Sequence, residues 1–183
     1  MEPITRTYNK EEFIETLTGN RVSRKSVLCG SQNIILLGKT IINPGVIIRG
    51  DLAKVTIGKY SVVSDNAVIR PAYKKFKGGI AFFPLTIGEY VNIEDDCVIS
   101  TAVIGSFVHI GKGSIISKRS ILKDCCRIEP GTVLAPDTVV PPFSVVSGCP
   151  GVVVAELPEC FEEFQRQKML SYYDHMQLIT PKT

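Results

Sequence analysis

The sequence predicts an all-β protein in which short parallel strands wind into a solenoid, followed by one C-terminal α-helix. Three observations lead to this fold class. An aliphatic residue returns every six positions over most of the chain. Branched residues dominate the apolar set, with 19 Val and 21 Ile against 11 Leu, which favours strands over helices. Beyond residue 155 the repeat stops, and apolar residues recur at helical spacing instead.

The six-residue repeat combines a large position with a small one. Four residues after each large aliphatic stands a small or β-branched residue, such as Ser61, Ala67 or Val103. Residues alternate faces along a strand, so both positions point inward when the chain turns between units. Three units then make one coil, and residues 42–151 hold about six coils. The large position is occupied by Ile57, Val63, Ile69, Ile87, Ile93, Ile99, Ile104, Ile110, Ile116, Leu122, Ile128, Leu134, Val140 and Val146.

Residues 1–155 are expected to form this solenoid domain. Before residue 41 the repeat is weaker, which predicts a first, irregular coil, and Leu37–Lys39 is a candidate for a tight hairpin. Residues 71–84 lack the register and are predicted to leave one corner as a loop without regular structure. Loops of this length are usually functional or mobile.

Residues 156–183 are expected to form an amphipathic helix and a tail. The helix is predicted over residues 156–180, with an apolar stripe that docks along the solenoid wall. The stripe consists of Leu157, Phe161, Phe164, Tyr172, Met176 and Ile179.

Composition excludes several classes of protein. The 183 residues suffice for one domain, and the longest apolar runs of four residues are far too short for a membrane helix. The N-terminus shows no signal peptide, and a net charge of +3 is too small to argue for nucleic-acid binding. The six cysteines include no Cys-x-x-Cys pair, so we expect reduced thiols in a cytosolic protein.

The segment Ile48–Gly58, which contains Arg-Gly-Asp within the repeat, resembles the γ-carbonic anhydrase branch of the hexapeptide-repeat superfamily. That resemblance implies a left-handed solenoid. It also implies a zinc site built from three histidines, but the corresponding positions here hold Arg70, Asp95 and Ser100. Because a catalytic zinc needs three protein ligands, we expect no metal, no cofactor and no catalytic residue.

The chain has two histidines, and neither is predicted to be catalytic. His109 is expected to point outward as a solvated surface residue, which argues against a hexapeptide acyltransferase that uses a histidine base. His175 is expected to pack or to lie at the surface of the C-terminal helix. Arg49 and Asp51 are expected to form a buried or intersubunit ion pair rather than a catalytic one.

The segment at residues 71–84 is the candidate interaction site. Exposed aromatic side chains usually mark such a site, and its lysines predict a partner with an acidic or polar rim. Two alternatives remain open: a merely solvated basic loop, or one stapled to the wall by its last two phenylalanines. The candidate partner-binding residues are Tyr73, Lys74, Lys75, Phe76, Lys77, Phe82 and Phe83.

Longer strings resemble the hexapeptide-repeat subunits of the dynactin pointed-end complex, including Ser26–Ile34, Ile47–Ala53, Ala81–Leu85 and Leu122–Cys126. The resemblance implies a non-enzymatic structural or adaptor role in dynein-driven microtubule transport and endosomal cargo recruitment. Its implied partners are dynactin subunit 6, subunit 4 and the pointed-end actin-related protein, with dynein and cargo adaptors reached indirectly. Its implied location is the cytoplasm and cytoskeleton, on microtubules and, through the complex, on vesicles. A zinc-dependent anhydrase-like enzyme or a hexapeptide acyltransferase remains the alternative.

Overall fold

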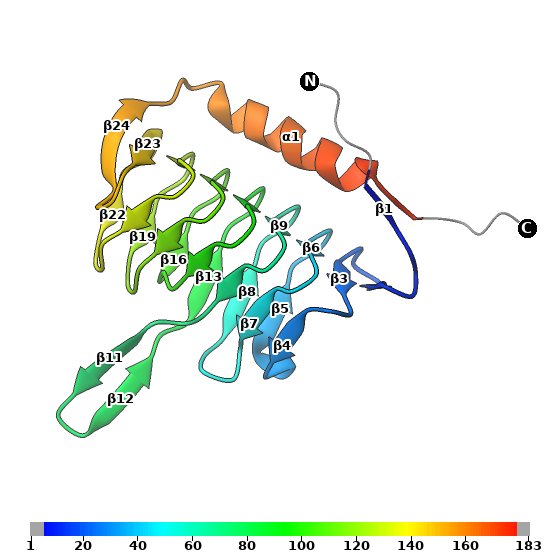
Figure 1. Cartoon of the computed structure of the whole chain (residues 1–183), viewed down its shortest axis with the longest axis horizontal. Coiled ribbons are helices and arrows are strands. Elements are labelled where there is room, and N and C mark those ends of the chain that lie inside the picture. Colours follow the sequence, from blue (N-terminus) through cyan, green and yellow to red (C-terminus); the bar gives the residue numbers. More distant parts are fainter. Residues whose placement is uncertain (1–5, 179–183) are drawn as a thin grey trace, which may run out of the picture.

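In the computed structural model, which describes residues 6–178, three parallel sheets form the walls of a triangular solenoid (Figure 1). The first wall consists of β3 (Arg21–Ser23), β6 (Ile41–Ile42), β9 (Val62–Val63), β14 (Asn92–Ile93), β17 (His109–Ile110), β20 (Arg127–Ile128) and β23 (Ser144–Ser147). The antiparallel strands β2 (Phe13–Glu15) and β24 (Val152–Glu156) form its two edges.

The other two walls follow the same stacking order. The second wall consists of β4 (Val27–Cys29), β7 (Ile47–Arg49), β10 (Val68–Ile69), β15 (Val98–Ile99), β18 (Ile115–Ile116) and β21 (Val133–Leu134). The third wall consists of β5 (Ile34–Leu36), β8 (Val55–Ile57), β13 (Leu85–Ile87), β16 (Val103–Ile104), β19 (Ile121–Leu122) and β22 (Val139–Val140). Each complete coil contributes one strand to each wall, and β23 adds a seventh strand to the first wall.

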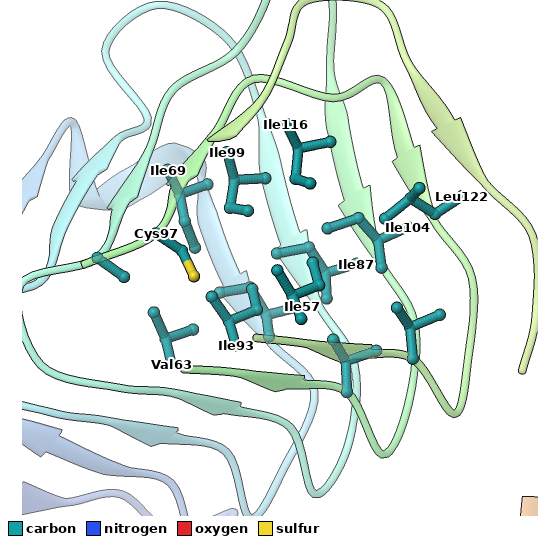
Figure 2. Close-up of a cluster of buried hydrophobic side chains, with 14 of the residues drawn as sticks. Ile57, Val63, Ile69, Ile87, Ile93, Cys97, Ile99, Ile104, Ile116 and Leu122 are labelled. Carbon is teal, nitrogen blue, oxygen red and sulfur yellow. The ribbon is translucent and has the colours of Figure 1, made fainter. Parts of the chain in front are cut away.

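The interior of the solenoid confirms the predicted large register, because all fourteen of its aliphatic residues are at most 1% exposed. Figure 2 shows several of these side chains converging from the three walls, among them Ile57, Val63 and Ile69. The small position is confirmed at most units, but Val103 is 40% exposed and was wrongly placed inside. The unit between Ile99 and Ile104 is one residue short, so the fully buried Thr101 takes the inward place and Val103 faces outward.

Close contact between coils explains why glycine follows several of the large aliphatics. A Cβ atom at Gly88 would lie 2.7 Å from the backbone carbon of Gly105 in the next coil. No side chain fits at that distance, so glycine permits the coils to stack.

The regular solenoid begins earlier than the sequence indicated, with β3, β4 and β5 as a complete first coil. A 3₁₀ turn, η1 (Ser31–Asn33), lies between β4 and β5. The predicted hairpin at Leu37–Lys39 is wrong. These residues connect β5 to β6, which lie in different walls, so they form an ordinary corner of the solenoid.

The C-terminal helix α1 (Phe161–His175) is shorter than predicted, because β24 occupies residues 152–156. It runs back along the first wall to the other end of the molecule, where β25 (Met176–Leu178) pairs with β1 (Arg6–Tyr8) (Figure 1). Among residues 6–178 no helix combines the length and the apolarity needed to span a membrane.

Docking of α1 on the wall is confirmed, but the predicted stripe is only partly right. The buried residues of the helix are Phe161, Gln165, Met169 and Tyr173, spaced by four, whereas Phe164 is 63% exposed. The sequence pattern missed Gln165 because it is polar. Its amide donates hydrogen bonds to the backbone carbonyls of Tyr90 (3.1 Å) and Val108 (3.4 Å) in the wall. The predicted stripe residue Ile179 lies outside the described residues.

A second apolar cluster joins the helix to both the wall and the N-terminal segment. The outward side chains of Ile41 and Val62 contact Met169, Tyr173 and Met176, together with Tyr8 and Phe13. The outer face of the first wall is therefore apolar at β6 and β9, and this part of it is covered from within the chain.

The segment at residues 71–84 is a β-hairpin rather than an irregular loop. Strands β11 (Tyr73–Phe76) and β12 (Gly79–Phe82) pair in antiparallel fashion and project from the corner between the second and third walls (Figure 1). Gly78 and Gly79 close the turn at φ values of 138° and 153°, which side chains rarely adopt. The sequence did not predict this hairpin, because β11 and β12 lack the six-residue register of the walls.

Candidate partner-binding site

The β11–β12 hairpin carries all but one of the candidate residues predicted from the sequence. Phe76 and Ile80 near its tip are 59% and 54% exposed. Tyr73 and Phe82 are only half-buried, because their rings pack against each other with centroids 5.9 Å apart. Four exposed aromatics were expected, but only Phe76 and Phe83 are exposed, since Tyr73 and Phe82 pack against each other. The side chains of Lys74, Lys75 and Lys77 are all exposed.

Phe83 follows β12 and lies at the foot of the hairpin. It lines a shallow apolar hollow of about 350 Å³ with Pro84, Thr86, Ala102, Val103 and Arg119. Its ring is still 37% exposed. Phe82 therefore packs within the hairpin, against Tyr73, whereas Phe83 lies beside residues of the third wall and stays exposed.

Arg119 anchors the base of the hairpin to the solenoid. Its guanidinium donates to the backbone carbonyl of Tyr73 at 3.2 Å and to both carboxylate oxygens of Asp137, at 2.7 and 2.8 Å. This pairing lowers the pKa of Asp137 below its ordinary value. The sequence reading did not single out Arg119 or Asp137, since both stand at corners of later coils, far from the hairpin in the chain.

A polar cavity of about 490 Å³ lies between the hairpin and these corners. The ammonium of Lys118 is 5.5 Å from the ring centroid of Tyr73, within cation–π range. The cavity brings together residues from three places in the sequence: Tyr73, Lys74, Lys75, Lys118, Arg119 and Asp137.

The three positions that correspond to zinc ligands lie at two different edges of the second wall. Arg70 and Ser100 follow β10 and β15 at one edge of the second wall, whereas Asp95 precedes β15 at the opposite edge. A guanidinium and a hydroxyl are poor ligands for zinc. Among residues 6–178, no three His, Cys, Asp or Glu side chains gather closely enough to hold a metal ion.

The prediction of a solvated His109 is wrong. Its side chain points outward from the first wall but is only 12% exposed, because α1 covers it. Its Nε2 lies 3.1 Å from a carboxylate oxygen of Glu94, and its Nδ1 lies 3.2 Å from the ammonium of Lys168. Burial, and then the charges of Lys168 and Arg127, lower the pKa of His109 to about 3. A neutral imidazole that donates from Nε2 to Glu94 and accepts at Nδ1 satisfies both contacts, so neither ring nitrogen is free to act as a base.

Two further expectations concern Arg49, Asp51 and the cysteines. Arg49 and Asp51 do form an ion pair, at 2.8 Å, but both side chains are more than one-third exposed rather than buried. All six cysteines are free. Cys97 and Cys126 lie inside the solenoid, and burial raises the pKa of each thiol to about 11, consistent with a packing role.

A column of aromatic rings under α1 was not predicted. Tyr60 and Tyr90 stack with centroids 5.4 Å apart, and Tyr90 and Phe107 with centroids 5.3 Å apart. Arg166 of α1 lies 5.1 Å from the centroid of Phe107. Each of these aromatics stands three residues after a large inward aliphatic, and this spacing is the signal that could have revealed the column.

A family model described as Dynactin subunit 5 matches residues 1–181. Dynactin subunit 5 of Dictyostelium discoideum is 55% identical over 174 residues, which cover 95% of this chain and 88% of that protein. The chain belongs to the dynactin subunit 5 family. The resemblance to dynactin subunits inferred from short strings is thereby confirmed.

The chain also shows more distant similarity to an archaeal protein and to a solved structure. A probable carbonic anhydrase of Methanocaldococcus jannaschii is 33% identical over 144 residues, covering 63% of this chain and 79% of that protein. A solved hexapeptide transferase family protein of Anaplasma phagocytophilum superimposes with a TM-score of 0.66 at 19% identity, covering 90% and 96% of the two chains. At that identity the structural likeness shows the fold alone, the left-handed parallel β-helix.

Proposed function

We propose that this chain is a non-enzymatic structural and adaptor subunit of the dynactin pointed-end complex. In this role it supports dynein-driven transport along microtubules and the recruitment of endosomal cargo. Its direct partners are dynactin subunit 6, subunit 4 and the pointed-end actin-related protein, and it reaches dynein and cargo adaptors indirectly. The complex would hold it in the cytoplasm at the cytoskeleton, on microtubules and on vesicles. Membership of the dynactin subunit 5 family supports the proposal.

The observation that carries the proposal is the projecting hairpin. Closing the solenoid does not require it, since β10 and β13 already occupy their places in the second and third walls. Its tip nevertheless exposes the large apolar side chains of Phe76 and Ile80. Exposed apolar groups on a protruding element usually mark a contact surface, and aromatic residues supply many of the strongest interface contacts.

The alternative is a zinc-dependent anhydrase-like enzyme or a hexapeptide acyltransferase. The archaeal relative and the transferase-like fold favour it. Three observations weigh against it. Arg70 and Ser100 are unsuited to bind zinc, and both ring nitrogens of His109 already have partners. His175 lies at the end of α1, where its Nδ1 is 2.7 Å from the backbone carbonyl oxygen of Ser171. The geometry therefore favours a binding role over catalysis.

The test replaces the exposed tip of the hairpin. We expect the double variant Phe76→Ser, Ile80→Ser to unfold with a free energy within about 0.5 kcal/mol of the unsubstituted chain, because both side chains are exposed. Its recovery of dynactin subunit 6, subunit 4 or the pointed-end actin-related protein should fall about tenfold or more. The measurement is affinity purification of the tagged full-length chain from cells, followed by quantitative immunoblotting of these three proteins.

The matched control is Leu17→Ser, which removes a fully exposed aliphatic side chain from the turn between β2 and β3. It should leave recovery of all three partners unchanged. Full recovery by the folded hairpin variant would contradict the contact role of the hairpin, and so would an equal loss in the control.

A further inference from the structure

The cavity beside the hairpin carries an excess of positive charge. Arg119 is neutralised by Asp137, whereas no carboxylate among the described residues forms an ion pair with Lys74, Lys75 or Lys118. Their charge reaches into the cavity, since Lys118 and Lys74 both contribute to the lowered pKa of Asp137. Three unpaired ammonium groups around one hollow favour an anionic occupant.

One edge of strand β11 opens onto the same cavity. Phe83 donates its backbone N–H to the carbonyl of Ala72, so hydrogen-bonded pairs alternate along the hairpin from that point. The backbone groups of Tyr73 and Lys75 therefore face away from β12. The bond from Arg119 to the Tyr73 carbonyl confirms this orientation. It leaves the N–H of Tyr73 and both backbone groups of Lys75 without a partner strand.

We propose that this cavity binds an extended, acidic segment of a partner protein, which adds as a third strand to the free edge of β11. The segment's backbone would pair with the N–H of Tyr73 and with both backbone groups of Lys75. Its carboxylates would meet Lys75 and Lys118 on the face of the hairpin that carries the Tyr73 ring. Strand addition obtains affinity from main-chain hydrogen bonds and specificity from alternate side chains. The inference rests on the proposed function only in taking the hairpin to meet a partner protein, and it specifies the chemistry of that partner.

A peptide suits this site better than a small anion does. A free phosphate would use the lysines and leave the strand edge unpaired, whereas an extended peptide uses both. Nucleic acid is a weaker candidate, because the whole chain carries a net charge of only +3. The site is also composite, with the strand from the hairpin and Lys118 from the corner after β18.

The test measures binding of a fluorescent eight-residue peptide of alternating Glu and Thr to the full-length chain. We expect saturable binding that weakens as salt is raised, because the contacts are between exposed charges. A second peptide of the same charge, with proline in place of two central threonines, should bind about tenfold more weakly, because proline cannot donate to the strand edge. Lys118→Glu should weaken binding of the first peptide by about tenfold or more.

The matched control is Lys77→Glu, which makes the same charge change at the turn of the hairpin, outside the cavity lining. It should alter affinity by less than about twofold. Equal effects of Lys77→Glu and Lys118→Glu, or equal binding of the two peptides, would overturn the proposal. Competition by inorganic phosphate at equal charge concentration would overturn it as well, because strand pairing would then contribute nothing.

The two proposals fail separately. Lys118 lies on the solenoid and not on the hairpin tip, so a Lys118→Glu chain still presents Phe76 and Ile80 to the dynactin partners. Loss of peptide binding with retained recovery of the three dynactin subunits supports the cavity as an independent site. Retained peptide binding in the Phe76→Ser, Ile80→Ser chain, together with full partner recovery, would contradict the contact role of the hairpin tip alone.

Discussion

Ile115 and Ile116 show how sharply this fold separates neighbouring residues. Both belong to the two-residue strand β18, but Ile115 is 42% exposed on the outer face whereas Ile116 is 1% exposed inside the solenoid. Residues of identical chemistry therefore differ only in the face that they occupy, because side chains alternate along a strand. The same alternation explains why the inward register could be predicted from the sequence alone.

This pair gives a matched test of the register. Ile116→Ala should lower the free energy of unfolding by about 2–5 kcal/mol, because it removes buried methyl groups and leaves a cavity between coils. Ile115→Ala should cost no more than about 0.5 kcal/mol, since its side chain already contacts solvent. Urea unfolding of both variants, followed by circular dichroism, measures the difference. Equal losses would show that the two faces have been assigned incorrectly.

The element that sequence reasoning described least well is α1 and the wall beneath it. The existence of the helix and its docking could be predicted, because its apolar residues recur at helical spacing. Its buried face could not be predicted, because Gln165 is buried by hydrogen bonds to backbone carbonyls of the wall, which no hydropathy pattern reveals. His109 was misplaced for the same reason: the residue that covers it, Lys168, lies 59 positions away in the chain.

The candidate site shows the same division. The exposed tip residues Phe76 and Ile80 belong to one short segment, so a local break in the repeat was enough to find that segment. The cavity depends on Lys118, Arg119 and Asp137, which the stacking of later coils brings to the base of the hairpin. Only the register of the complete solenoid places them there.

The packing of α1 against the first wall should lose stability in acid, because His109 lies between them. The unfolded state takes up a proton as the pH falls below about 6.5, whereas the native state resists protonation until a pH of about 3. The contribution of the neutral, buried imidazole is therefore fully present above pH 6.5. It is lost progressively between pH 6.5 and 3, by at most about 1.4 kcal/mol per pH unit.

Urea unfolding at pH 7, 6, 5 and 4 measures this effect. The His109→Gln variant should lose stability less steeply with falling pH than the unsubstituted chain, because it lacks the titrating group. His175→Gln provides the control, since His175 lies at the end of α1 and not between the helix and the wall. Parallel slopes for all three chains would contradict a role for His109 in sealing this interface.

At the scale of the whole molecule, the C-terminal end of the solenoid presents an open strand edge. Stacked coils leave an edge at each end unless another element covers it. At the C-terminal end, residues 148–151 cover β21, with hydrogen bonds to Val133, and β24 pairs with β23. The outer edge of β24 itself is unpaired within the described residues. Its side chains Val152, Val153 and Val154 are 58%, 50% and 57% exposed.

These exposed valines on an open strand edge predict that the isolated chain self-associates through β24. In the assembly, we expect a second β-helical subunit to stack on the same surface. The small net charge of +3 does little to oppose such contact. Val153→Lys should raise the dissociation constant of the self-associated form about tenfold or more, because a lysine ammonium resists burial at a strand edge.

Val98→Lys is the control, because Val98 is 38% exposed in the middle of the second wall, away from either end. Sedimentation velocity across a range of concentrations measures both. A monomer of the unsubstituted chain that persists at high concentration would contradict the stacking surface, as would an equal effect of the two lysines.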